Sequence, residues 1–190
     1  MAGAPCAPIM AAMSSRGTSS LVTRGVRLTW IVLHLLRGLL TVAALFPLLS
    51  GPRRSNAVKH WSQGLLRILA VRLHVHGRLL REHARPAMLV ANHVSWLDIF
   101  VINAVLPVRF VAKSEVRLWP AIGWLSAKTG TLFIERGRRR DTARINNEVA
   151  DALRAGDVIA VFPEGTTTDG AQVLRFHSAL LQPALMAGAQ

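Results

Sequence analysis

The first 81 residues of the chain contain no aspartate and no glutamate, although they contain ten arginines and one lysine. Residues 82–190 contain twelve basic and ten acidic side chains, so most of the net charge of +13 lies in the N-terminal part. That part is also very apolar. A segment that is both basic and apolar is typical of proteins that lie on an anionic membrane. An anionic membrane surface is therefore the expected partner, and nucleic acid is not.

Cysteine is almost absent as well: Cys6 is the single one. One cysteine cannot form an internal disulfide, which excludes a small fold held together by disulfide bridges. Cys6 lies in a head rich in Ala, Ser and Pro, residues 1–20, which we expect to be disordered.

The chain also lacks an uninterrupted hydrophobic run of about 20 residues, the length that a membrane-spanning helix needs. The most apolar stretch, residues 29–49, is interrupted by His34 and Arg37. We expect an interfacial or re-entrant helix here, with a single span as the alternative. Residues 57–70 predict a second, amphipathic helix. Residues 21–70 would thus form a pair of membrane-associated helices, and an ordinary core-facing pair remains the other alternative.

From residue 71 onward the pattern indicates alternating strands and helices. Strands are predicted at 71–77, 87–91, 108–112, 131–134 and 158–162, and helices at 95–106, 119–130 and 141–156. The last helix has Asp141 as its expected N-cap and Gly156 as its C-cap. The fold class is therefore α/β, with a mostly parallel sheet flanked by helices and preceded by the N-terminal helical pair.

Two histidines, His74 and His76, share one face of the first predicted strand. A metal site needs a third and a fourth ligand at suitable spacing, and the sequence shows none. We expect no metal ion and interpret this face as solvated or hydrogen-bonded.

The richest chemistry follows the predicted strand 87–91. His93 comes directly after it, and Asp98 lies five residues further on. Ser95 is the expected N-cap of the next helix, which puts Asp98 at the acidic position of a capping box. Asp98 would then only cap the helix. The alternative is that its carboxylate orients the imidazole of His93 as a general base.

A second polar stretch, residues 162–170, follows the strand 158–162. Successive N–H groups from Gly165 to Thr168 could form a nest for an anion or an oxyanion, and Glu164 could bind a hydroxyl group. Lys113 and Arg136 follow two other strands and are candidate phosphate ligands. In parallel sheets, ligands bind beyond the carboxyl ends of the strands, so these residues are expected to converge.

Three stretches together resemble the glycerophospholipid acyltransferase family, most closely its bacterial 1-acylglycerol-3-phosphate acyltransferases. The first is Asn-His-x-x-x-x-Asp, here Asn92 to Asp98, and the second is Gly-x-x-Phe-Ile-x-Arg, here Gly130 to Arg136. The third is Phe-Pro-Glu-Gly-Thr, residues 162–166. The resemblance covers roughly residues 60–185, and the N-terminal helix pair is also similar to family members.

The resemblance implies that His93 is the general base on the hydroxyl of a lysophospholipid and that Asp98 orients it. It further implies that Arg136, Glu164, Gly165 and Thr166 bind the acceptor or stabilise the oxyanion. The acyl donor would be acyl-CoA or acyl-carrier protein, with no other cofactor. The implied location is the cytoplasmic face of the bacterial inner membrane.

Two departures from the family pattern bear on these expectations. Many enzymes that act on lysophosphatidate have Arg after Phe-Pro-Glu-Gly-Thr, where this chain has Thr167, and a similar pattern resembles relatives that act on lyso-ornithine lipid. The fourth family motif, a Val-Pro-Val-like strand, should follow Gln190, so we expect the α/β domain, residues 71–190, to be incomplete at its C-terminus.

Two further hypotheses come from other functional classes. The arginine excess and the run Arg138–Arg140 would suit a nucleic-acid-binding module, but aromatic residues do not interleave with that run as stacking platforms would. An inactive membrane adaptor would bind lipid without turnover.

Overall fold

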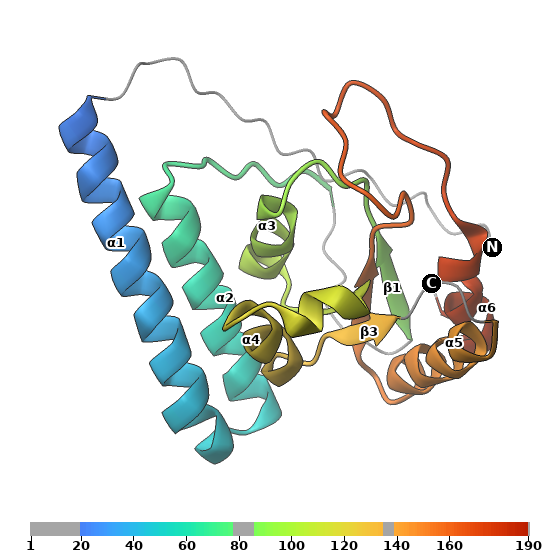
Figure 1. Ribbon diagram of the computed structural model, residues 1–190. Coiled ribbons are helices and arrows are strands. Elements are labelled where there is room, and N and C mark those ends of the chain that lie inside the picture. The colour runs from blue at the N-terminus through green and yellow to red at the C-terminus, as the bar shows by residue number, and fades with distance from the viewer. Residues whose placement is uncertain (1–19, 78–85, 135–138, 190) are drawn as a thin grey trace.

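The computed structural model describes residues 20–77, 86–134 and 139–189, with the side chains of residues 139–142 excepted. Of the predicted head, residues 1–20, only Ser20 is among the described residues, and Cys6 lies outside them. Figure 1 shows two long helices side by side, α1 (Leu21–Leu40) and α2 (Gly51–Ile68), next to an α/β unit built around a small sheet.

The connection between the two helices follows from its residues. Ser20 begins α1, since its hydroxyl accepts a hydrogen bond from the Thr23 N–H at 3.2 Å. After α1 the chain makes a π-helical turn, η1 (Thr41–Leu45), and a 3-10 turn, η2 (Phe46–Leu48), that contains Pro47. α2 then begins at Gly51 with Pro52 in its first turn, where proline is tolerated. Both predicted helices are present, and both begin earlier than expected.

Two reciprocal hydrogen bonds, each from a side chain of one helix to the backbone of the other, join α1 and α2. His34 Nε2 lies 2.8 Å from the Trp61 carbonyl oxygen, and Trp61 Nε1–H donates to the His34 carbonyl oxygen at 3.0 Å. The two rings stack with centroids 4.7 Å apart. Gly38 and Gly64 make room for them, because an added Cβ would come within 2.5 Å of Trp61 and 2.6 Å of His34 respectively.

α2 also packs against α3 (Leu97–Val105), which joins the helix pair to the α/β unit. The Gln63 side-chain amide donates to the Ala104 carbonyl oxygen at 2.9 Å, and the Trp61 ring contacts the Phe100 ring at 5.5 Å between centroids. The same tryptophan therefore contacts both α1 and α3.

The sheet contains four parallel strands in the order β1-β4-β2-β3. They are β1 (Ala87–Val90), β2 (Arg109–Lys113), β3 (Leu132–Ile134) and β4 (Val158–Val161). β4 is central and fully buried, as a continuous apolar run predicts. Because the strands are parallel, the residues that follow each one emerge at the same edge of the sheet. The predicted α/β fold is confirmed.

The predicted strand at 71–77 is wrong. Residues 71–76 have no regular structure, and the Val71 N–H instead donates to the Leu66 carbonyl oxygen to close the end of α2. No described strand pairs with this segment. His74 and His76 are exposed, and no group of three or more His, Cys, Asp or Glu in the described part of the chain is placed to hold a metal ion.

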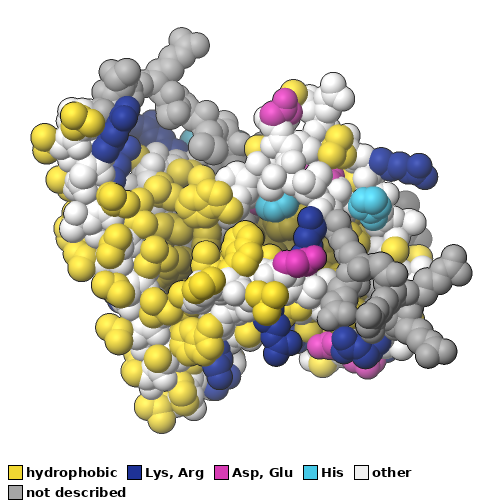
Figure 2. All heavy atoms as spheres, in the orientation of Figure 1, with side chains coloured by type: hydrophobic (Ala, Val, Ile, Leu, Met, Phe, Trp, Pro, Cys, Tyr) yellow, Lys and Arg dark blue, Asp and Glu magenta, His cyan; other side chains and the backbone are white. Residues whose placement is uncertain are grey.

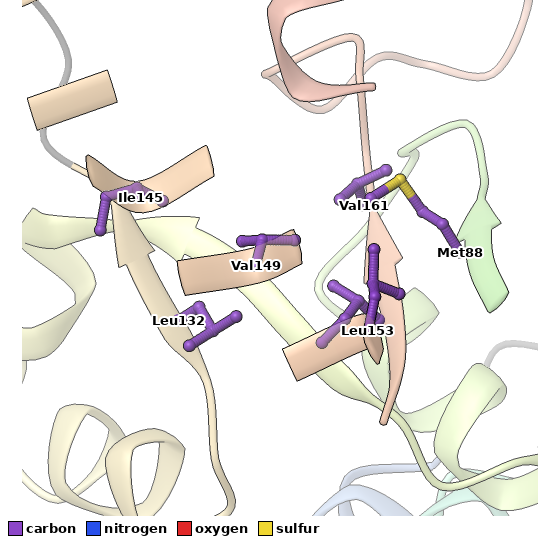
Figure 3. Packing of buried hydrophobic residues seen from close by; sticks show 7 residues of the cluster. Met88, Leu132, Ile145, Val149, Leu153 and Val161 are labelled. Carbon is purple, nitrogen blue, oxygen red and sulfur yellow. The ribbon is translucent and has the colours of Figure 1, made fainter. Parts of the chain in front are cut away.

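The main core lies between the sheet and α5 (Arg139–Arg154), as Figure 3 shows. Ile145, Val149 and Leu153 recur every fourth residue and pack against Leu132 and Val161. α5 ends at Arg154, and Gly156, the expected C-cap, follows two residues later with φ +95°. Its start differs from the prediction: α5 already begins at Arg139, so Asp141 lies inside the first turn and is not the N-cap.

Two short helices follow β2 at the sheet edge, η3 (Ser114–Leu118) and α4 (Ile122–Lys128). α4 was expected to start at Pro120, but a tight turn comes first. The Ile122 N–H donates to the Pro120 carbonyl oxygen at 2.6 Å, and Ala121 between them has φ +59° and ψ −49°. This is a γ-turn of the rare, strained kind. The described chain ends in η4 (Ser178–Leu180) and α6 (Gln182–Ala187), which packs on α5.

Candidate active site

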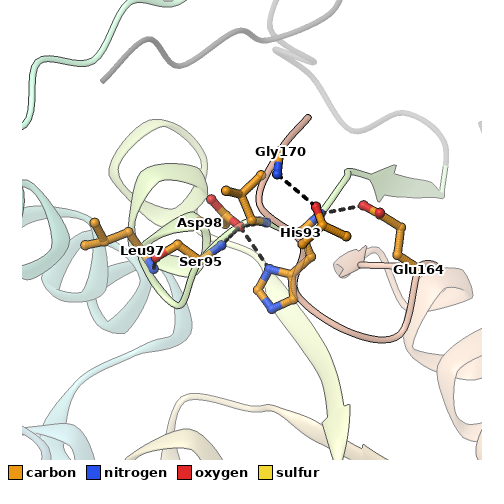
Figure 4. Close-up of polar contacts among 8 residues, drawn as sticks. His93, Ser95, Leu97, Asp98, Glu164 and Gly170 are labelled. Atoms are coloured by element: carbon orange, nitrogen blue, oxygen red, sulfur yellow. Dashed lines mark hydrogen bonds and ion pairs between the residues drawn. The ribbon is translucent and has the colours of Figure 1, made fainter. Parts of the chain in front are cut away.

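His93 and Asp98 meet at the carboxyl end of β1. His93 Nδ1 lies 2.9 Å from Asp98 Oδ2, as Figure 4 shows. With the Nδ1–H donated to the carboxylate, Nε2 on the other side of the ring carries the lone pair. The His93 side chain is 18% exposed, so the imidazole is held in place and can still be reached from solvent. This is the geometry that a general base requires.

Asp98 serves as a helix cap at the same time. Its Oδ2 also accepts the N–H groups of Val94 at 2.8 Å and Ser95 at 2.9 Å. α3 begins at Leu97, so Ser95 lies one position before the N-cap residue and not at the expected place. Its hydroxyl accepts from the Leu97 N–H at 3.2 Å. The two sequence interpretations are therefore not exclusive, because one oxygen both caps the helix and contacts the histidine.

These contacts decide the charge of Asp98. Burial alone would raise the pKa of the Asp98 carboxyl. The hydrogen bonds from His93, Ser95 and Val94, together with the positive charge of a protonated His93, outweigh burial and lower the pKa below its usual range. Asp98 is therefore ionised at neutral pH and can stabilise an imidazolium on His93.

The ring of His93 is supported from the neighbouring strand. It stacks on the Phe162 ring, with centroids 4.0 Å apart and an interplanar angle of 15°. Phe162 directly follows β4 and in turn stacks on Phe110 of β2 at 5.9 Å. The imidazole is thus fixed by Asp98 at its edge and by Phe162 on its face.

Glu164 is a buried carboxylate, with the residue only 3% exposed, and both of its oxygens are used. Oε1 accepts the His93 N–H and Oε2 accepts the Leu174 N–H, each at 2.8 Å. Figure 4 shows His93 between Asp98 and Glu164. Glu164 therefore ties the loop of His93 to the segment that follows β4. The sequence suggested a contact with a substrate hydroxyl, and it gave no sign of these backbone partners.

The predicted oxyanion nest from Gly165 to Thr168 is only partly available. The Gly165 N–H donates to the Phe162 carbonyl oxygen at 3.0 Å, and the Thr168 N–H donates to the His93 carbonyl oxygen at 2.9 Å. A nest built on all four N–H groups is therefore not formed. Gly165 has φ +72°, which explains the glycine, and Thr166 and Thr167 are exposed beside the His93 loop.

The structure describes one of the two predicted phosphate ligands. Lys113 is exposed at the carboxyl end of β2, at the same sheet edge as His93. Arg136 lies outside the described residues.

A hollow beyond β2 and β3 contains two arginines that the sequence did not single out, Arg117 and Arg144. Its other lining residues are Ser114, Glu115, Leu118 and Phe133. The Arg117 guanidinium lies over the Phe133 ring at 5.8 Å.

Comparison with known families gives one match that covers more than half of the chain. The family described as Acyltransferase matches residues 72–190. This range contains every candidate site residue named above.

Curated relatives agree in chemistry and differ in acceptor. A 1-acyl-sn-glycerol-3-phosphate acyltransferase of Neisseria meningitidis is 43% identical over 137 residues, which is 72% of this chain and 53% of the relative. A lyso-ornithine lipid O-acyltransferase of Pseudomonas aeruginosa is also 43% identical over 137 residues, with 72% of this chain and 52% of the relative covered. The chain thus spans about half the length of the curated relatives it matches.

A solved structure has the same fold. The 1-acyl-sn-glycerophosphate acyltransferase PlsC from Thermotoga maritima superposes with a TM-score of 0.68, at 21% identity, over 89% of this chain and 70% of that one. The match extends beyond the α/β unit, residues 71–190, because that unit is shorter than the aligned share.

Proposed function

The chain belongs to the acyltransferase family, and on that premise we propose that it transfers a fatty acyl group to the free hydroxyl of a lysophospholipid. The observation that carries the proposal is the contact between His93 Nδ1 and Asp98 Oδ2 at 2.9 Å, which leaves Nε2 as the base. The donor is acyl-CoA or acyl-carrier protein.

The proposed reaction needs no covalent enzyme intermediate. His93 Nε2 takes the proton of the acceptor hydroxyl as its oxygen attacks the thioester carbonyl carbon. Asp98 stabilises the imidazolium that forms. When the tetrahedral intermediate collapses, the carbon–sulfur bond breaks, and the thiolate takes the proton from the imidazolium. His93 is thereby returned to its neutral form.

Lysophosphatidate is the main candidate acceptor. Its phosphate requires cationic groups, and Lys113, at the same sheet edge as His93, supplies one. Arg136 is proposed as a second. Lyso-ornithine lipid is the alternative acceptor, and the observation in its favour is Thr167 at a position where enzymes acting on lysophosphatidate often have arginine. In this proposal, Glu164 positions the His93 loop, and Thr166 faces the acceptor.

The helix pair is proposed to hold the protein on an anionic membrane, at the cytoplasmic face of the inner membrane. Leu21–Leu48 is long and apolar enough to cross a bilayer by length and composition. However, α1 packs along α2, and α2 packs against α3 of the α/β unit. This side-by-side attachment favours a pair that lies in the interface over a helix that crosses it alone.

The test is acyl transfer from labelled acyl-carrier protein or acyl-CoA to lysophosphatidate and to lyso-ornithine lipid in mixed micelles. His93→Ala should lower turnover by about 10²–10⁴-fold, the usual contribution of a general base. His74→Ala, which removes an exposed histidine on the segment before β1, is the matched control and should leave turnover unchanged. Equal activity of the wild type and His93→Ala would rule out the proposed base. No transfer to either acceptor, with lipid binding intact, would favour an inactive adaptor.

A further inference from the structure

The η3–α4 corner, defined as Leu118, Trp119, Ile122 and Trp124, exposes large apolar side chains on the described surface. Leu118 is 82% exposed and Trp119 is 55% exposed, and the other two are exposed as well. Single exposed apolar residues need no explanation, but four within seven positions of one turn form a patch. We propose that the η3–α4 corner is a second membrane-contact surface, which enters the headgroup region of an anionic bilayer. The proposal rests on the function proposed above.

The composition of the corner fits a bilayer interface better than a protein partner. Two of its four residues are tryptophans, the side chain that prefers the boundary between headgroups and acyl chains. Three exposed basic residues flank them, Lys113, Arg117 and Lys128, against one acid, Glu115. Trp124 and Lys128 lie one turn apart on α4, so the amine can reach toward anionic headgroups while the indole enters the interface.

The corner is also rigid. The γ-turn at Ala121 fixes the chain between η3 and α4, and Gly123 packs so closely on the Arg117 carbonyl oxygen that no Cβ would fit. Backbone strain of this kind persists only where the surrounding structure enforces it. The backbone that carries these apolar side chains is therefore fixed before any membrane contact is made.

The position of the corner relates it to both the helix pair and the active site. η3 begins immediately after β2, at the sheet edge where His93 and Glu164 lie. In Figure 2, hydrophobic side chains cover the α1–α2 side of the molecule and continue across the front toward η3 and α4. Contacts at the helix pair and at the corner would together fix the orientation of the active-site edge relative to the bilayer.

The experiment places an environment-sensitive fluorophore at position 118 of the full chain. Cys6 is first replaced by Ser, and Leu118→Cys is then labelled. Leu185→Cys on α6 is the matched control, because Leu185 is also 82% exposed. A third probe, Leu40→Cys at the end of α1, reports the helix pair. With vesicles of phosphatidylcholine and phosphatidylglycerol, the probe at 118 should shift to the blue and be quenched by lipids that carry a bromine or nitroxide group, while the probe at 185 should not change.

Three outcomes would overturn the proposal. In the first, the probe at 40 would respond and the probe at 118 would not, which would leave membrane contact to the helix pair alone. In the second, the emission of the probe at 118 would shift without lipid as the protein concentration rises, which would make the corner an interface between copies of the chain. In the third, the emission of the probe at 118 would shift on addition of acyl-carrier protein alone, which would make the corner a binding site for the acyl donor.

A charge substitution separates this proposal from the proposed reaction. Leu118→Glu should weaken binding to anionic vesicles on the order of tenfold or more, because an apolar contact becomes an anionic one. Leu185→Glu makes the same charge change and should bind as the wild type does. Both variants should transfer acyl groups equally well to acceptor presented in detergent micelles. Loss of vesicle binding with micellar turnover intact supports the corner, and equal binding by both variants overturns it. Absence of micellar turnover in the wild type would instead contradict the proposed reaction.

Discussion

The imidazole of His93 and the ring of Phe162 lie face to face, 4.0 Å apart between centroids, although 69 positions separate them in the chain (162 minus 93). The contact joins the loop after β1 to the residue that follows β4. It gives the proposed base a flat apolar support on one face, while Asp98 contacts its edge.

Phe162→Leu should lower turnover as well as the free energy of unfolding. Leucine keeps most of the buried volume but cannot stack on the imidazole, and aromatic pairs contribute about 0.5–1.5 kcal/mol beyond their buried area. We expect turnover to fall by up to about tenfold. The control is Phe110→Leu, which removes the other aromatic contact of Phe162 and leaves the His93 contact in place. Equal losses of turnover in the two variants would show that stacking does not position the base.

Asp98→Asn should destabilise the fold at neutral pH, by about 1.5–3 kcal/mol for hydrogen bonds to a charged group. The pKa of Asp98 is lowered in the folded chain, so its stabilising contribution is fully present above the ordinary aspartate pKa of about 3.9. That contribution is lost as the pH falls through the folded pKa. Unfolding curves of wild type and variant, recorded from pH 7 downward, should therefore converge in acid. A difference that stays constant with pH would contradict this assignment.

Glu164→Gln should impair catalysis through kcat and leave the KM for the acceptor nearly unchanged. Glutamine places an amide donor against one of two backbone N–H groups, which leaves a buried donor unsatisfied and costs about 1–3 kcal/mol. Displacement of the His93 loop would slow the chemical step. Steady-state kinetics with varied acceptor tests this. A large rise in KM at constant kcat would mean that Glu164 binds the acceptor directly, as the family resemblance implied.

Gly64→Ala and Gly38→Ala should separate α1 from α2. The new methyl groups would approach His34 and Trp61 within 2.6 Å and 2.5 Å respectively. Overpacking of this kind costs about 1–3 kcal/mol, which exceeds the roughly 1 kcal/mol that alanine gains over glycine in a helix. Gly25→Ala, on the same α1 with nothing within 4 Å, is the control and should be neutral or stabilising. Thermal unfolding in detergent provides the measurement. A stabilised Gly64→Ala would show that the two helices do not pack in this way.

The parts that could be predicted from the sequence are those with a repeating apolar pattern. α5 was visible because Ile145, Val149 and Leu153 recur at helical spacing, and β4 because its apolar run is continuous. The strand predicted at 71–77 does not form, although its residues alternate between apolar and polar. Its alternation describes an extended chain, but a strand also needs a partner, and no described strand pairs with it.

The residue types of the candidate site could be predicted from the sequence, but their hydrogen-bond partners could not. His93 and Asp98 are close in the chain, so their contact could be anticipated. The Glu164 carboxylate accepts a hydrogen bond from the backbone of His93, 71 positions away. The His34 ring forms one with the Trp61 carbonyl oxygen, 27 positions away. Backbone N–H and carbonyl groups are the same in every residue, so the sequence carries no signal for such partners.

The shared oxygen of Asp98 has a consequence for heat sensitivity. The first turn of a helix opens more easily than the rest, and here the carboxylate that closes it is the one that orients His93. Brief opening of this turn would release the imidazole while the sheet and α5 stay folded. Activity should therefore decline on warming at temperatures below the unfolding transition, and return on cooling.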